Sequence, residues 1–122
     1  MQLWTLHSQL LVAIEYNDIP TAKSIFQQGI DPDIRFCIGS HQMPAICLCA
    51  ERGHYDMAKL FIENGCNVNQ MDDCGFAPIH FACNHLCINI VKLLISHKAD
   101  VNATSNYGHT PLHLAVQQPS LG

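Results

Sequence analysis

The chain has 122 residues, about half of them hydrophobic, which suits one domain with a packed core. Six basic against ten acidic residues give a formal net charge of −4, and with no cluster of lysine and arginine this excludes wide contact with nucleic acid. No apolar run reaches about 18 residues, and residues 1–7 do not read as a signal peptide, so we expect no membrane contact.

The first predicted unit covers about residues 6–39 and ends in a hairpin. Its hairpin string, residues 28–33, matches residues 64–69 at a spacing of 36, whereas the later units repeat at a spacing of 33. The three extra residues are predicted to lie in a loop near residues 37–40. Asn17 is expected in the turn between two helices, because asparagine tolerates the positive φ that this turn requires.

The second unit, about residues 40–72, contains a predicted second helix with apolar residues at helical spacing. These residues are Met57, Ala58, Leu60, Phe61 and Ile62. The first helix of the unit lacks two favourable residues at its start, because Ala45 replaces the proline of later units and Pro44 cannot cap with its side chain. Gly53 and Gly65 supply the positive φ expected at the two helix ends.

The third unit, about residues 73–105, has predicted helices over Pro78–His85 and Ile88–Ser96, each too short to be stable without stacked neighbours. The apolar face of the second helix comprises Ile90, Val91, Leu93, Leu94 and Ile95. Leu86 and Lys98 occupy the two positions that glycine holds in the second unit. A non-glycine residue at positive φ costs about 1–2 kcal/mol, so this unit is predicted to be strained unless its turn has a different shape.

The fourth unit, residues 106–122, repeats the start of the third, with residues 106–118 aligned on residues 73–85. Thr110 is predicted to cap the helix of this unit, Pro111–Gln118, whereas Ala77 cannot cap the corresponding helix of the third unit. No partner helix and no polar cap follow. The sequence therefore indicates a fragment of a longer array, or an end that is covered by a copy of the same chain.

Two strings of the chain resemble the ankyrin family. Thr110-Pro111-Leu112-His113-Leu114-Ala115 resembles the most recognisable string of that family, and Lys98-Ala99-Asp100-Val101-Asn102-Ala103 resembles its hairpin string. The resemblance covers nearly the whole chain, in three aligned copies. It implies a single all-α domain over residues 1–122, an ankyrin-repeat solenoid of stacked helix-turn-helix units with short β-hairpin turns.

Eight histidines and seven cysteines suggest a metal site, but their spacing does not favour one. The closest pairs include His80-x-x-Cys83 and Cys47-x-Cys49, and none is the Cys-x-x-Cys pair typical of zinc sites. His80 and His113 are expected instead to be buried and to hydrogen-bond at the starts of their helices. We therefore predict no metal and no cofactor.

The cysteines are predicted to be reduced thiols, because their number is odd, no signal peptide is recognised and several replace small apolar residues. Cys49 and Cys83, for example, align with alanine in neighbouring units. Cys74 is expected at an exposed hairpin tip, where His80 and His41 are conceivable bases, but no pocket is predicted around it. We therefore predict no catalytic residue, no enzymatic activity, and a cytoplasmic or nuclear location.

The surface of the stack is the remaining feature that can carry function. The resemblance implies binding at the hairpin tips and the concave face of the first helices, so we predict a protein–protein interaction module whose partner is another protein. The alternative is a structural unit that forms a homodimer through its C-terminal repeat. Phe76 and Tyr107 are the predicted aromatic anchors. The full set of predicted partner-binding residues is His41, Met43, Glu51, Arg52, Asp73, Cys74, Phe76, Asn84, His85, Asn106, Tyr107, His109 and Gln117.

The resemblance also implies a modification site. Hairpin asparagines of ankyrin repeats can be substrates of an asparaginyl hydroxylase, and residues 94–102 resemble the preferred context. Asn102 is the first candidate and Asn69 the second. The alternative role of both is structural, as hydrogen-bonding residues of the hairpin.

Overall fold

A computed structural model describes residues 3–117 of the chain. The elements, in chain order, are α1 (Leu3–Glu15), α2 (Ile19–Gln27), β1 (Arg35–Ile38), β2 (His41–Pro44), α3 (Ala45–Arg52), α4 (Tyr55–Glu63), α5 (Pro78–Asn84), α6 (Ile88–Ser96) and α7 (Pro111–Val116). The last helix was predicted to reach Gln118, which lies outside the described residues. None of the described helices is long and apolar enough to cross a membrane.

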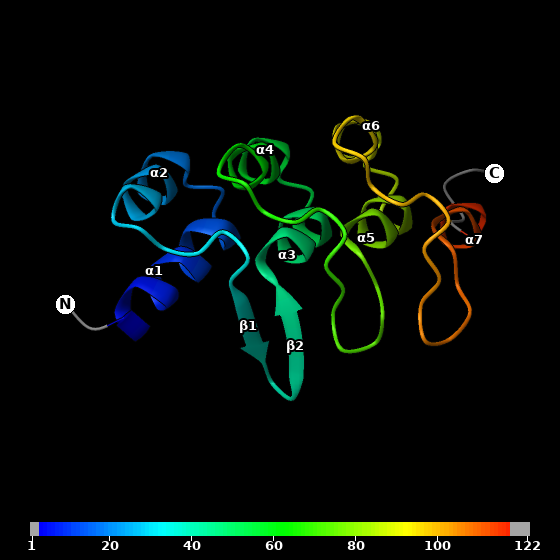
Figure 1. Cartoon of the computed structure of the whole chain (residues 1–122), viewed down its shortest axis with the longest axis horizontal. Helices are drawn as coiled ribbons and strands as arrows, with labels where there is room; N and C mark the ends of the chain where they lie inside the picture. The colour runs from blue at the N-terminus through cyan, green and yellow to red at the C-terminus, as the bar shows by residue number, and fades with distance from the viewer. Residues whose placement is uncertain (1–2, 118–122) are drawn as a thin grey trace.

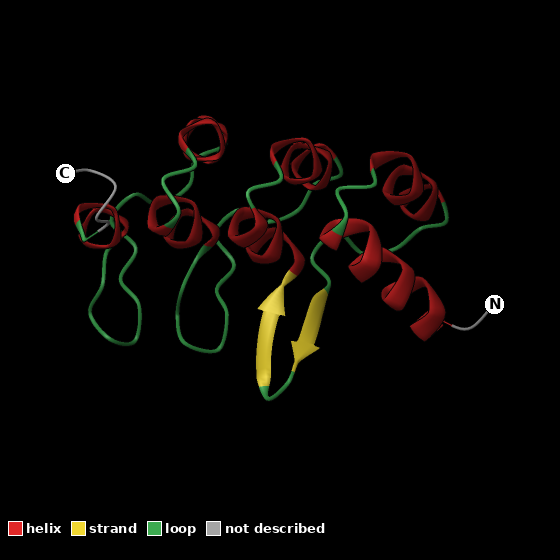
Figure 2. Ribbon diagram, turned by 180° about the vertical axis from the view of Figure 1, so that it is seen from behind, coloured by secondary structure: helices red, strands yellow, loops and turns green. Residues whose placement is uncertain are grey.

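The helices form two rows (Figure 1 and Figure 2). The first row contains α1, α3, α5 and α7, and the second row contains α2, α4 and α6. The hairpins project from the first row, on the side away from the second row. An antiparallel pair of short helices leaves apolar surface on both sides, and neighbouring pairs cover it in this arrangement. The stack predicted from the repeat pattern is therefore confirmed.

The hydrophobic core centres on α3. Every residue from Ala45 to Ala50 is buried, because α1 and α5 pack on two sides of this helix. Phe61 of α4 is also fully buried and meets Phe26 of α2 edge to face, with the ring centroids 4.9 Å apart. The apolar face predicted for α4 is confirmed, since all five of its residues are buried.

The apolar face predicted for α6 is only partly buried. Ile90, Leu93 and Leu94 are buried, whereas Val91 is half-buried and Ile95 is exposed. α6 packs against α4 and α5, and no described helix lies on its other side in the second row. Ile95 of the predicted apolar face therefore stays exposed, because burial of a repeat face requires a neighbour on each side.

The turns confirm the predicted positions of positive φ. Asn17, Leu86 and Lys98 have φ values of 53°, 53° and 71°. The Leu86 N–H donates to the Cys83 carbonyl oxygen at 3.2 Å, which is the same i to i−3 bond that the turn at Gly53 forms. The third unit therefore keeps the standard turn shape and carries the strain of two non-glycine residues in the left-handed region.

The first-row helices begin as the sequence predicts. Thr110 Oγ1 accepts the His113 N–H at 3.3 Å at the start of α7. Pro44 and Ala77 provide no side-chain cap to α3 and α5. At α5, a side chain of the helix satisfies part of the exposed backbone, because the Ala77 N–H donates to His80 Nδ1 at 2.9 Å.

The three hairpins differ in regularity. β1 and β2 pair antiparallel around Gly39 and Ser40, where the sequence predicts the three additional residues. The hairpins at residues 72–76 and 105–109 form loops, each closed by a backbone hydrogen bond of 2.9 Å across its base. The first hairpin is therefore the one with a β-ladder in the described part of the chain.

Candidate interaction face

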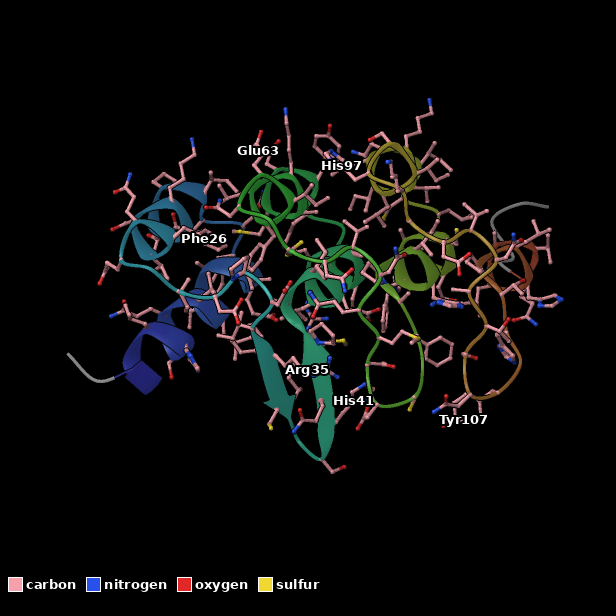
Figure 3. All side chains as sticks on the ribbon, in the orientation of Figure 1. Phe26, Arg35, His41, Glu63, His97 and Tyr107 are labelled. Atoms are coloured by element: carbon pink, nitrogen blue, oxygen red, sulfur yellow. The ribbon has the colours of Figure 1, made fainter. Side chains whose placement is uncertain are left out.

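The first-row helices and the hairpins together present one side of the molecule, which we call the inner face. It comprises the exposed sides of α3, α5 and α7 with hairpin residues 35–44, 72–77 and 105–110, and Figure 3 shows His41 and Tyr107 on two of these hairpins. The exposed members of the predicted set are Arg52, Asp73, His85, Asn106, Tyr107 and Gln117. The half-buried members are His41, Met43, Glu51, Cys74, Phe76, Asn84 and His109.

A pocket of about 290 Å³ lies on the inner face between α3, α5 and α7. Its lining consists of Glu51, Phe76, His80, Phe81, Asn84, His109 and Leu114. Four of these residues belong to the set predicted from sequence, and His80 was predicted to be structural. Phe81 and Leu114 were missed. They hold the same repeat position, directly after the histidine of each unit, and this recurring apolar residue is the signal that identifies them.

Phe76 forms the aromatic centre of the pocket and is not an exposed anchor. Its ring centroid lies 5.4 Å from that of His80 and 6.0 Å from that of Tyr107. It also lies 6.1 Å from the ring centroid of Phe81. The prediction that Phe76 is exposed was therefore wrong, because neighbouring rings surround it. Tyr107 is 66% exposed and remains an available aromatic side chain.

Two histidines connect α5 to the third hairpin. His80 Nδ1 accepts the Ala77 N–H, so its Nε2 carries the proton and donates to the His109 carbonyl oxygen at 3.0 Å. His80 is buried, which confirms its predicted role. The ring of His109 has a buried Nδ1 with no hydrogen-bond partner among the described residues. The pocket wall therefore contains a polar atom whose hydrogen bond is unmade.

His113 holds the corresponding position in α7 but is exposed. Its Nδ1 accepts the Thr110 N–H at 3.1 Å, so the predicted hydrogen bond is present. The predicted burial was wrong, because His80 is covered by the hairpin of the following unit and no described segment covers His113 in that way.

Charged side chains at the end of α3 pair with neighbouring first-row helices. Glu51 Oε1 lies 2.8 Å from His85 Nε2 at the end of α5. Arg52 Nε donates to both carboxylate oxygens of Glu15 on α1, at 3.1 and 3.2 Å. The Arg52 charge is thus directed to α1, and the charged group that lines the pocket is the Glu51 carboxylate.

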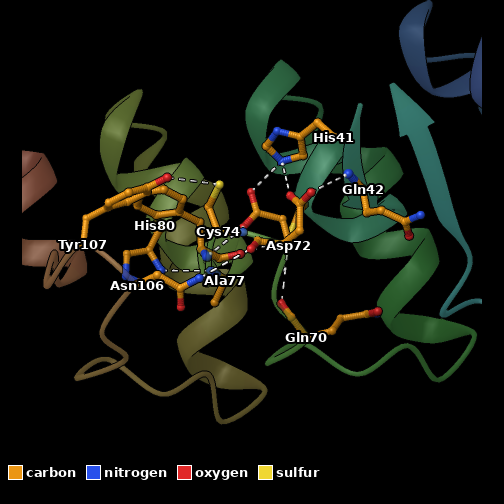
Figure 4. A network of polar contacts seen from close by, with 12 residues as sticks. His41, Gln42, Gln70, Asp72, Cys74, Ala77, His80, Asn106 and Tyr107 are labelled. Atoms are coloured by element: carbon orange, nitrogen blue, oxygen red, sulfur yellow. Dashed lines mark hydrogen bonds and ion pairs between the residues drawn. The ribbon is translucent and has the colours of Figure 1, made fainter. Parts of the chain in front are cut away.

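A polar network joins the first and second hairpins (Figure 4). His41 Nε2 lies 2.9 Å from Asp72 Oδ2 and 3.2 Å from Asp73 Oδ1. These three side chains could hold a metal ion. Sequence spacing does not reveal this set, because His41 is separated from the aspartates by about one repeat and the spacing typical of zinc sites concerns histidines and cysteines.

Cys74 is half-buried at the second hairpin, and neither predicted base is directed at it. His41 contacts the two aspartates, and His80 bonds Ala77 and the third hairpin. Instead, the Tyr107 hydroxyl donates to Cys74 Sγ at 3.6 Å, and this hydrogen bond raises the pKa of Tyr107. Neither histidine is therefore placed to act as a base for Cys74.

All seven cysteines are free thiols, and three of them are buried. Burial raises the pKa of Cys47 and Cys49 well above the ordinary value, and it raises the pKa of Cys66 to about 12. Protonated thiols are poor nucleophiles and poor ligands. Cys49 is a small core residue, as predicted, whereas Cys83 is only half-buried.

The two candidate asparagines differ in their hydrogen bonds. Asn69 Oδ1 accepts the Asp100 N–H at 2.8 Å, and Asn69 Nδ2 donates to the Lys98 carbonyl oxygen at 3.2 Å. Asn102 is exposed, and its backbone N–H donates to Asp100 Oδ1 at 3.0 Å. The side chain of Asn69 therefore links two units, while Asn102 contributes its backbone to the hairpin.

Comparison with known proteins identifies the repeat. The family described as ankyrin repeats, in three copies, matches residues 10–105 and residues 46–121. The two matches together cover most of the chain and include the pocket. A search of curated proteins found no match.

Proposed function

The chain belongs to the ankyrin-repeat family, whose repeats are generic protein–protein interaction modules, and we propose that it binds a protein partner through the inner face. The pocket between α3, α5 and α7 carries this proposal, because it lies where residues predicted for partner contact converge. Interfaces gain most of their free energy from a few side chains inserted into such desolvated pockets.

Ankyrin-repeat proteins typically act without catalysis, and we assign this chain no reaction. Its seven free thiols favour a cytoplasmic or nuclear location.

The charge around the pocket favours a partner with a basic side chain. Glu51 lines the pocket, and the exposed side chain of Asp73 lies on the adjacent hairpin. The lysines of the helices, by contrast, belong to the second row, on α2, α4 and α6. Opposite charges increase the rate of association and select among partners. The expected partner segment therefore presents a large apolar side chain to the pocket and a lysine or arginine beside it.

Peptide display against the immobilised full chain provides ligands of known sequence for the test. Titration calorimetry then measures their affinity for Leu114→Ala and Glu51→Gln, and each is expected to weaken binding at least tenfold, or about 1.4 kcal/mol. Lys59→Ala on α4 is the matched surface control and is expected to leave affinity unchanged. If either inner-face variant binds the peptides as tightly as the parent chain, or if the control loses binding, the proposal is contradicted.

Self-association is the second candidate function, and exposed apolar residues of α7 favour it. Leu112 is 70% exposed and Val116 is 62% exposed, which is unusual for leucine and valine in a helix of a stack. In this alternative, two copies pair through α7. Sedimentation at two concentrations tests it: a concentration-dependent dimer that Leu112→Glu abolishes supports pairing, and a monomer at both concentrations rejects it.

Hydroxylation of Asn102 is a further proposal that the hydrogen bonds support. The Asn102 side chain is exposed, and its side-chain amide makes no hydrogen bond among the described residues. An oxygen added to this side chain would therefore disturb no contact there. Asn69 uses both side-chain atoms to join two units and is the weaker candidate. Intact-mass and fragment analysis of protein from eukaryotic cells decides between them, and protein with no added oxygen on Asn102 or on Asn69 would reject both candidates.

A further inference from the structure

We propose that His41, Asp72 and Asp73 form a binding site for a divalent transition-metal ion, with Zn²⁺ as the best-fitting ion. The site lies between the first and second hairpins (Figure 4). It combines one imidazole nitrogen with two carboxylate oxygens. Such a donor set suits zinc, for which imidazole and carboxylate are ordinary ligands. Calcium and magnesium favour sites made of oxygen ligands alone.

The three ligand atoms already surround one point. His41 Nε2 is 2.9 Å from Asp72 Oδ2 and 3.2 Å from Asp73 Oδ1, and all three atoms lie within 4.8 Å of one another. Atoms with these separations share a centre that is at most about 2.5 Å from each, and zinc ligands lie at about 2.0–2.2 Å. A shift of a few tenths of an ångström therefore converts the present contacts into metal–ligand distances.

Backbone hydrogen bonds fix the two carboxylates in this orientation. Asp72 Oδ1 accepts the N–H groups of Cys74 and Phe76, each at 2.9 Å, so Asp72 Oδ2 is left to face His41. Asp73 Oδ2 accepts the Gln42 N–H at 3.3 Å, which leaves Asp73 Oδ1 for the same point. Metal sites gain affinity when hydrogen bonds outside the ligands orient them before the ion arrives.

The charge of the cluster favours a cation. Two carboxylates face one imidazole nitrogen, which carries a single hydrogen and cannot donate a full hydrogen bond to both oxygens. No lysine or arginine forms an ion pair with Asp72 or Asp73 in the described residues. When the ion binds, His41 Nε2 gives up any proton it carries to solvent and donates its lone pair to the metal. The ion then offsets the charge of both carboxylates.

Solvent can complete the coordination from one side. The side chains of His41 and Asp73 are 40% and 42% exposed, whereas that of Asp72 is fully buried. The ion can therefore enter from the inner face, and water supplies the remaining ligand positions. Three protein ligands with an open position are typical of zinc sites that keep bound water.

Titration calorimetry with Zn²⁺ on the full chain tests the site, with ¹⁵N spectra of the histidine rings to identify the ligand. One ion per chain is expected, with a shift of the His41 Nε2 signal. His41→Ala and Asp73→Asn are each expected to weaken zinc binding at least tenfold. His85→Ala is the matched control, because His85 has the same 40% exposure but faces only one carboxylate, and it is expected to bind zinc as the parent does.

The free thiols could also bind zinc, and two further measurements distinguish thiol binding from binding at the proposed site. Circular dichroism first establishes that each variant is folded. Mn²⁺, which prefers oxygen and nitrogen to thiolate, is expected to bind the same site more weakly than Zn²⁺. Equal zinc affinity in the parent and in His41→Ala would overturn the proposal, as would an unchanged His41 Nε2 signal or no saturable binding at all.

Discussion

Replacement of Lys98 by glycine is expected to stabilise the protein, although it removes a side chain. Lys98 has a φ of 71° and an exposed side chain, at the C-terminal end of α6. The left-handed conformation costs a non-glycine residue about 1–2 kcal/mol. Glycine removes that cost, but it adds about 0.5–1 kcal/mol of unfolded-state entropy. Loss of a positive charge at a helix C-terminus costs about 0.3 kcal/mol more. The net gain is about 0.5 kcal/mol.

A matched variant makes this gain measurable. Lys92→Gly removes the same exposed side chain inside α6, where glycine is expected to cost about 1 kcal/mol. The two variants share the entropy of the added glycine, so their stabilities are expected to differ by about 1.5 kcal/mol. Urea denaturation followed by circular dichroism measures this difference. Equal destabilisation by both glycines would refute the reasoning, because it would mean that the Lys98 turn stores no strain.

Three further changes test the core, a helix cap and a buried thiol. Thr110→Ala is expected to cost about 1 kcal/mol through loss of the cap on α7, whereas Thr110→Ser retains stability in the same urea titration. Phe61→Ala is expected to lower the free energy of unfolding by about 3–5 kcal/mol, since this ring is fully buried; a loss below about 1 kcal/mol would show that the core collapses around the gap. The pKa of Cys66 is raised from 9.0 to about 12, so below pH 9 the thiol is protonated in both states, and above it only the unfolded state loses the proton. Between pH 8 and pH 10 the parent is therefore expected to lose about 1.4 kcal/mol more stability than Cys66→Ala, and identical pH profiles would contradict the assigned burial.

The features that depend on local backbone geometry could be predicted from the sequence. Leu86 and Lys98 were placed at positive φ by alignment with glycines one repeat earlier, and the structure has both there. The same alignment placed the Thr110 cap correctly. These features depend on neighbouring residues of one unit, so a repeat of 33 residues carries them from unit to unit.

Features that depend on contact between units were harder to predict. His113 was expected to be buried like His80, but its burial needs a following hairpin that no described segment provides. His41 meets Asp72 because β2 lies beside the second hairpin, and sequence spacing does not give the distance between hairpins of neighbouring units. Phe81 was missed for a similar reason. The aligned residue one repeat earlier, Leu48, is buried, whereas Phe81 lines the pocket between units.

Burial along the first row differs from helix to helix, and this constrains how the protein can vary. In α3, residues 45–50 are fully enclosed and include two alanines and two cysteines, so larger side chains there would force the neighbouring helices apart. In α7, Pro111 is the one buried residue of the described helix. Substitutions are therefore expected to accumulate at the exposed positions of the hairpin tips, while residues 45–50 of α3 stay nearly invariant. New binding preferences can arise at those tips without a cost to the stability of the stack.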